Sequence, residues 1–115
     1  MQHETLQVLR DSSIVENVED ISFQGYEETF RLEARAILVN AWKLDVFIHR
    51  TEDRDRYSFH VSEDAELVVR WDNAPHHPGI RTHPYHRHEN DEIHPSEEMD
   101  VRKVLREIGE RMEQK

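Results

Sequence analysis

The stretch FRLEARAIL at residues 30–38 decides the fold, because its apolar side chains recur at every second position. A period of two places alternate side chains on opposite faces of a strand, so the stretch predicts a long, half-buried β-strand. The same alternation returns at residues 42–49, 57–62 and 67–72, and residues 15–23 indicate a first strand. Links of only a few residues join these segments, which together predict an antiparallel meander.

A helix is expected at the C-terminal end of this sequence. Its apolar positions follow the i, i+3, i+4, i+7, i+11 spacing of one helix face. Asp100 is a favourable N-cap, so the pattern predicts a helix over about residues 100–113. A helix packed on one face of the sheet buries the apolar side of both elements, and the expected class is α+β with about five strands. The positions that form the helix face are Val101, Val104, Leu105, Ile108 and Met112.

Composition limits the architecture and the chemistry. The 115 residues predict a single domain spanning 1–115, and the formal net charge of −10 requires a local basic patch for any binding to nucleic acid. Without cysteine, disulfides and thiolate chemistry are excluded. No signal-peptide pattern opens the sequence and no apolar run is long enough to cross a bilayer, so we expect a cytoplasmic protein with no membrane partner.

Residues 73–96 differ from the rest of the chain. They hold all four prolines and six of the nine histidines, and they contain very few aliphatic residues. Loops of this length inside a small domain are usually functional or disordered. The pattern therefore predicts a His-rich loop between the last strand and the helix, and the functional site is expected there.

Three strings in this region resemble a known family. YSFH at residues 57–60, RWDNAPHHP at 70–78 and HPYHRH at 83–88 are similar to motifs of the TumE-type toxins of prokaryotic toxin–antitoxin pairs. The resemblance extends over roughly residues 55–110, and it covers residues 1–54 only in hydrophobic spacing. It implies a toxin with a cognate antitoxin, expected to be a helix-turn-helix protein, and an action on RNA by analogy with most small protein toxins.

Our first hypothesis for the histidines is a metal-independent ribonuclease without a cofactor. Cleavage of RNA needs a base for the 2′-OH proton, an acid for the leaving oxygen and a cation for the phosphate, which imidazoles and a guanidinium supply. The expected acids and bases are His76, His77, His86 and His88. Phosphate contacts are assigned to Arg70 and Arg87, with Tyr57 supporting the phosphate or polarising a histidine.

Substrate contacts are expected on the polar face of the sheet. Side chains at alternate positions of the strands share this face and include enough cations to form the basic patch that the net charge demands, although acidic residues are interleaved with them. An aromatic ring in the loop offers a surface on which a base stacks. The residues assigned to substrate binding are Arg31, Arg35, Lys43, His60 and Tyr85.

Three other interpretations remain open. A metal-binding protein would use the same loop, with zinc or another divalent transition metal held by Asp72, His77, His86 and His88. The loop is also consistent with a solvated segment that only positions the helix. A non-catalytic interaction module, docking on a partner through exposed strands or the loop, is the remaining alternative.

Overall fold

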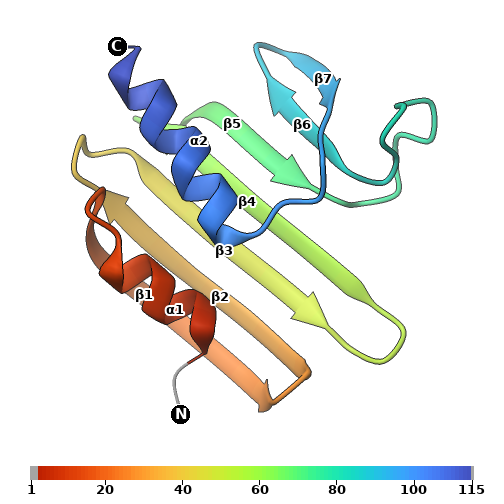
Figure 1. Ribbon diagram of the computed structural model, residues 1–115, viewed down its shortest axis with the longest axis horizontal. Helices are drawn as coiled ribbons and strands as arrows, with labels where there is room; N and C mark the ends of the chain where they lie inside the picture. Colours follow the sequence, from red (N-terminus) through yellow and green to blue (C-terminus); the bar gives the residue numbers. More distant parts are fainter. Residues whose placement is uncertain (1–2, 115) are drawn as a thin grey trace.

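Seven strands pair in the order in which they occur along the chain, and every neighbouring pair is antiparallel (Figure 1). The computed structural model describes residues 3–114. The elements are α1 (Glu4–Asp11), β1 (Val15–Tyr26), β2 (Thr29–Leu38), β3 (Lys43–Arg50), β4 (Asp55–Glu63), β5 (Glu66–Asp72), β6 (His86–Glu89), β7 (Glu92–Pro95) and α2 (Val101–Glu113). The predicted α+β class and meander are confirmed.

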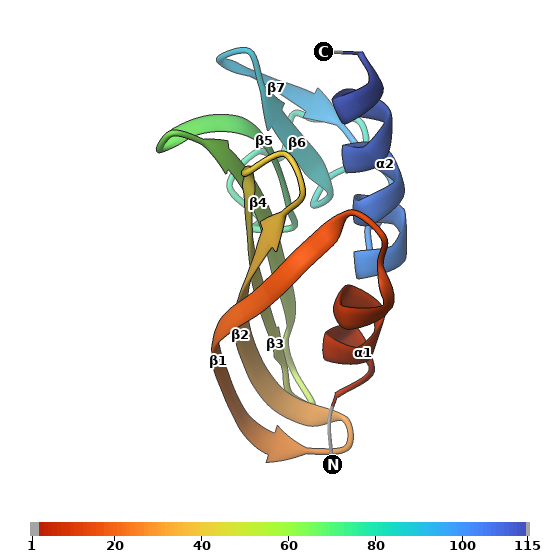
Figure 2. The same ribbon diagram turned by 90° about the vertical axis from the view of Figure 1, so that its left-hand side faces the viewer.

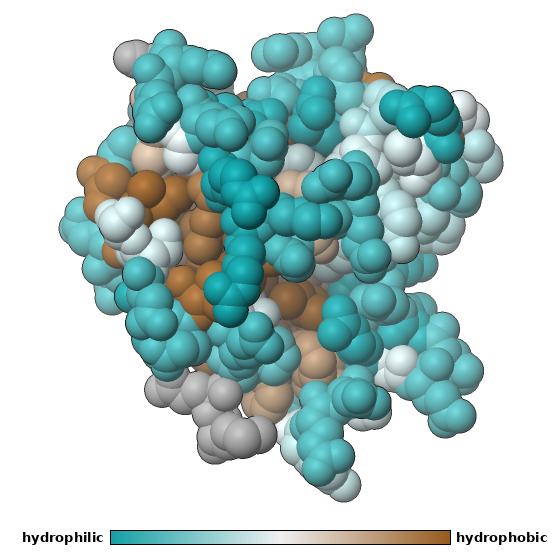
Figure 3. All heavy atoms as spheres, in the orientation of Figure 1, coloured by the Kyte–Doolittle hydropathy of each residue, from teal (hydrophilic) through white to brown (hydrophobic). Residues whose placement is uncertain are grey.

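Both helices cover the same face of the sheet and leave the other face free (Figure 2). The predicted C-terminal helix is confirmed: the Asp100 carboxylate accepts a hydrogen bond of 2.9 Å from the backbone N–H of Lys103, which caps α2. Val104 and Ile108 are fully buried against the sheet. Seen from the helix side, hydrophilic residues cover the helices and apolar residues show between them (Figure 3). In the described part of the chain, no helix has the length and apolar content needed to cross a membrane.

The sheet has two more strands than the five or so expected, because part of the segment predicted as a loop forms a hairpin. β6 and β7 have four residues each, and the turn between them places Asn90 and Asp91 at φ values of 56° and 60°. Two consecutive left-handed residues are typical of the tight turns that match the twist of a hairpin, and Asn and Asp tolerate this conformation. The His-rich loop is therefore limited to residues 73–85.

α2 holds the β6–β7 hairpin through a bidentate ion pair. Arg111 donates hydrogen bonds of 3.1 Å from Nε and 3.0 Å from Nη2 to the carboxylate of Glu89 at the end of β6. The same guanidinium lies 5.3 Å from the ring centroid of Trp71, which is buried on the helix side of β5. This contact ties the short strand β6 to both the helix and the core.

The helix-free face carries a row of polar side chains that crosses five strands. The register places Arg35 opposite Asp45, Asp45 opposite His60, His60 opposite Arg70, and Arg70 opposite His88. Apolar residues occupy the alternate positions and face the helices. The row ends at β6, where the histidines gather.

Truncation of Ile108 tests the packing of α2 on the sheet. We expect Ile108→Ala to lower the free energy of unfolding by about 2–5 kcal/mol, because it leaves a cavity in the core. Glu110→Ala, on the exposed side of the same helix, is the matched control and should change stability by less than about 0.5 kcal/mol. Denaturant unfolding measures both; similar values for the two variants would contradict the packing described here.

Candidate functional site

Three histidines meet at the end of the polar row and form what we call the imidazole triad: His77, His86 and His88. Their ring centroids lie 4.8 Å apart for His86 and His88, 4.9 Å for His77 and His86, and 5.7 Å for His77 and His88. One nitrogen from each ring lies within 4.8 Å of the other two. Imidazoles from two separate stretches of the chain therefore converge on one point.

Strand pairing explains how two of these rings come together. In β6, His86 and His88 are two residues apart and so share the helix-free face. The antiparallel register sets them opposite Asp72 and Arg70 of β5. His77 lies in the turn that leaves β5, whose start is held by a hydrogen bond of 3.1 Å from the Ala74 N–H to Asp72 Oδ1.

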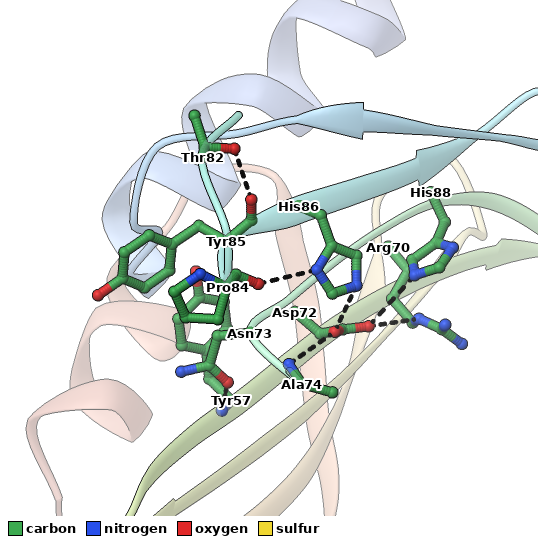
Figure 4. A network of polar contacts seen from close by, with 10 residues as sticks. All are labelled: Tyr57, Arg70, Asp72, Asn73, Ala74, Thr82, Pro84, Tyr85, His86 and His88. Carbon is green, nitrogen blue, oxygen red and sulfur yellow. Dashed lines mark hydrogen bonds and ion pairs between the residues drawn. The ribbon is translucent and has the colours of Figure 1, made fainter. Parts of the chain in front are cut away.

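The carboxylate of Asp72 connects the groups of the site (Figure 4). It is 7% exposed, and its Oδ1 lies 2.8 Å from His86 Nε2. Its Oδ2 accepts a hydrogen bond of 3.0 Å from Arg70 Nε and lies 3.6 Å from His88 Nε2. A buried carboxylate needs such partners to offset its desolvation, so Asp72 both depends on and orients the side chains around it.

His86 is held at both ring nitrogens. Its Nδ1 lies 2.9 Å from the carbonyl oxygen of Pro84, while its Nε2 faces Asp72, and the side chain is only 2% exposed. A carbonyl and a carboxylate both accept hydrogen bonds, so each ring nitrogen of His86 faces an acceptor. Buried and engaged at each end, this ring holds the other groups of the site in position.

His88 has one ring nitrogen that makes no hydrogen bond within the described chain. This atom, Nε2, is buried. Burial lowers the pKa of His88, and the positive charge of Arg70 lowers it further, against an opposing effect of Asp72. The same two causes, burial and then Arg70, lower the pKa of the neighbouring His60. Burial and Arg70 thus favour the neutral form of the His88 imidazole.

Three residues assigned to the chemistry lie away from the triad. His76 is exposed and joins none of the ring contacts found among the described residues. Arg87 lies between the two β6 histidines and therefore faces the helix side, with its Nε 3.0 Å from Glu89 Oε1. Tyr57 is buried on that side too; its hydroxyl accepts a hydrogen bond from Met99 N–H, and burial raises its pKa. Of the two arginines proposed to contact phosphate, the site includes only Arg70.

The residues assigned to substrate binding are also divided between the two faces. Tyr85 stacks on Tyr57 on the helix side, with ring centroids 6.4 Å apart. On the helix-free face, Arg35 is paired with Asp45 at 2.7 Å and Arg31 with Glu33 at 3.7 Å.

A hollow in that face, of about 290 Å³, has acidic as well as basic walls. Asp20, Glu33 and Asp45 line it together with Arg35 and His60. Lys43 is exposed at one side of the same face. The expected basic patch is therefore balanced by acids, and Arg70 is the cation nearest to the triad.

Asn73 is a residue whose role the sequence pattern did not reveal. Its Oδ1 accepts a hydrogen bond of 2.9 Å from the backbone N–H of Tyr57, and its Nδ2 donates one of 2.6 Å to the carbonyl of Asp55. The buried amide thus closes the start of β4 against the end of β5. An Asn directly after a strand is the only signal in the sequence, and it does not identify a partner 16 residues away.

The comparisons with known proteins gave one match. A family model described as toxin TumE matches residues 5–114. No match was found among curated proteins or among solved structures. The matched region contains all residues of the triad together with Asp72 and Arg70.

Replacement of Asn73 distinguishes a structural from a chemical role. We expect Asn73→Ala to lower the free energy of unfolding by about 1–3 kcal/mol, because the Tyr57 N–H is then buried without a partner. Asn73→Asp keeps an acceptor for Tyr57 but lacks the donor to Asp55, so its loss should be smaller. Thermal and denaturant unfolding measure both. Unchanged stability combined with lost biological activity would instead make Asn73 part of the reactive site.

Proposed function

Because this chain belongs to the TumE toxin family, we propose that it is the toxin half of a toxin–antitoxin pair and acts on RNA at the imidazole triad. Family membership implies a cognate antitoxin. We expect that antitoxin to be a helix-turn-helix protein and the toxin to act in the cytoplasm, where RNA is abundant. The observation that carries the proposal is the convergence of three imidazoles beside the guanidinium of Arg70.

Arg70 supplies the contact to the phosphate. Its Nε is bonded to Asp72, which fixes the guanidinium plane, and the two Nη atoms point away from that carboxylate (Figure 4). The side chain is 36% exposed, so these donors remain accessible from solvent. A fixed guanidinium with free donors suits a phosphodiester, whose two non-bridging oxygens match its fork.

His77 and His88 are the proposed proton-transfer pair, in a metal-independent cleavage. His88 has an unpartnered Nε2, and His77 is half-buried in the loop that borders the site. One of them takes the 2′-OH proton and the other protonates the leaving 5′-oxygen, while His86 and Asp72 hold the geometry. This division of roles follows from the contacts of each ring, because His86 has no nitrogen left for substrate.

The test uses His77→Ala, since this half-buried ring can be removed with little effect on the core. Expression of the natural chain without an antitoxin should arrest growth, and His77→Ala should relieve the arrest. Cleavage of RNA by purified protein should fall by about 10²–10⁴-fold in the variant. His83→Ala, which removes an exposed imidazole from the same loop, is the matched control and should behave like the natural chain.

Two outcomes would contradict the proposal. If expression of the natural chain leaves growth unaffected, the protein does not act as a toxin. If His77→Ala and its control are equally toxic at equal stability, the triad is not the reactive site, and the non-catalytic interaction module becomes the better interpretation.

A further inference from the structure

The three imidazoles of the triad offer nitrogen ligands that lie close together, and Asp72, whose Oδ1 is 2.8 Å from His86 Nε2, offers a fourth ligand beside them. We propose that this site also binds a divalent transition metal ion, zinc by preference, through His77, His86, His88 and Asp72, and that the bound ion blocks the reaction. The first part stands on the geometry alone. The second part rests on the proposed function, because it requires proton transfer by the same imidazoles.

The donor set and its spacing favour zinc. Imidazole nitrogen and carboxylate oxygen are both zinc ligands, with bond lengths of about 2.0–2.2 Å. The three imidazole nitrogens already lie within 4.8 Å of one another, and His86 Nε2 is 2.8 Å from Asp72 Oδ1. Binding requires the rings to rotate until the four atoms reach the separations of a tetrahedral shell. The oxygen-only shells that Ca²⁺ and Mg²⁺ prefer are absent from this cluster.

The ring nitrogens of His86 and His88 are arranged as a metal site requires. The carbonyl of Pro84 holds His86 Nδ1–H, which leaves Nε2 directed at the centre of the cluster. Such a hydrogen bond from the non-coordinating nitrogen is the usual support of a metal-bound histidine. At His88 the relevant feature is an unsatisfied atom: Nε2 is buried without a hydrogen bond. The free-energy cost of burying this nitrogen unpaired is removed when it coordinates an ion.

The charges at the site are compatible with a cation. His86 Nε2 and Asp72 Oδ1 face each other at 2.8 Å, and an ion bound by both atoms would be a positive partner for the carboxylate. Arg70 opposes the ion by its own charge, but it binds Oδ2 of Asp72. Oδ1 also accepts the hydrogen bond from Ala74 N–H, and its side that faces His86 Nε2 is the one available to an ion. The expected result is binding through one carboxylate oxygen.

The number of ligands argues that the ion inhibits the reaction. Four protein ligands complete a tetrahedral shell, whereas catalytic zinc sites keep one position open for water or substrate. A coordinated imidazole has also given its lone pair to the metal, so it can neither accept nor deliver a proton. Occupied by zinc, His77 and His88 are thus unavailable for the chemistry proposed above.

Binding is tested first, without reference to activity. Protein purified without a histidine tag and washed with chelator is titrated with Co²⁺, whose four-coordinate form absorbs strongly in visible light, and zinc is then added to displace it. We expect close to one equivalent of each metal. His77→Ala and His88→Ala should weaken binding by more than about tenfold, which is at least the effect of losing a supporting contact. The control His83→Ala should bind as the natural chain does.

Retention of the fold is checked by circular dichroism for each variant, and His77→Ala serves if His88→Ala does not fold. Binding well below one equivalent would overturn the metal site. Equal affinity in the natural chain and His77→Ala would do so as well, since it would place the ion elsewhere.

Activity is measured second, as RNA cleavage in chelator and with one equivalent of zinc. We expect full cleavage in chelator and at least a tenfold loss with zinc. Loss of cleavage in chelator and its recovery with zinc would overturn the inhibition while leaving the site. Cleavage that depends on His77 in a protein that binds no metal would remove this inference and leave the proposed function. A protein that binds the metal but has no effect on RNA or growth would leave the metal site and remove the proposed function together with the inhibition.

Discussion

The site depends on one buried carboxylate. Asp72 ends β5, and its two oxygens hold a ring from β6, a guanidinium from its own strand and the backbone N–H of Ala74 in the loop. An ionised carboxylate in the interior is tolerated only with such partners. Two of these partners, His86 and Arg70, belong to the candidate site, so the contacts that stabilise Asp72 also arrange that site.

Most of the fold could be predicted from the sequence because its signals are local. Alternation from Phe30 to Leu38 is visible in the chain itself, and the helix face from Val101 to Met112 repeats at a regular interval. The β6–β7 hairpin lacked such a signal: its strands are short and polar on both faces, and only Asn90-Asp91 indicates the turn. The sequence pattern also does not identify the N-terminal helix α1, because its eight residues give only about two turns in which to show a helical spacing.

The residue types of the candidate site could be predicted from the sequence, but the face of the sheet on which each residue lies could not. Strand alternation explains the main difference: a loop has no fixed faces, so Arg87 was grouped with His86 and His88, whereas a strand sends it to the opposite side. Alternation likewise places Tyr57 of β4 on the helix side, and Tyr85 of the loop stacks on it there. The contact between Asp72 and His86 joins residues 14 positions apart, and no spacing rule reveals it.

The sequence of β6, His-Arg-His-Glu, has a consequence for the C-terminal helix. A slip of one position would exchange imidazoles for a guanidinium and an acid on the open face, and a strand that pairs with β5 through only three residues resists this weakly by itself. The bidentate ion pair between Arg111 and Glu89 holds β6 in its register with β5. The last turns of α2 therefore fix the register of β6 against β5. Their loss would shift His86 and His88 relative to Asp72 and Arg70 in a chain that is otherwise still folded.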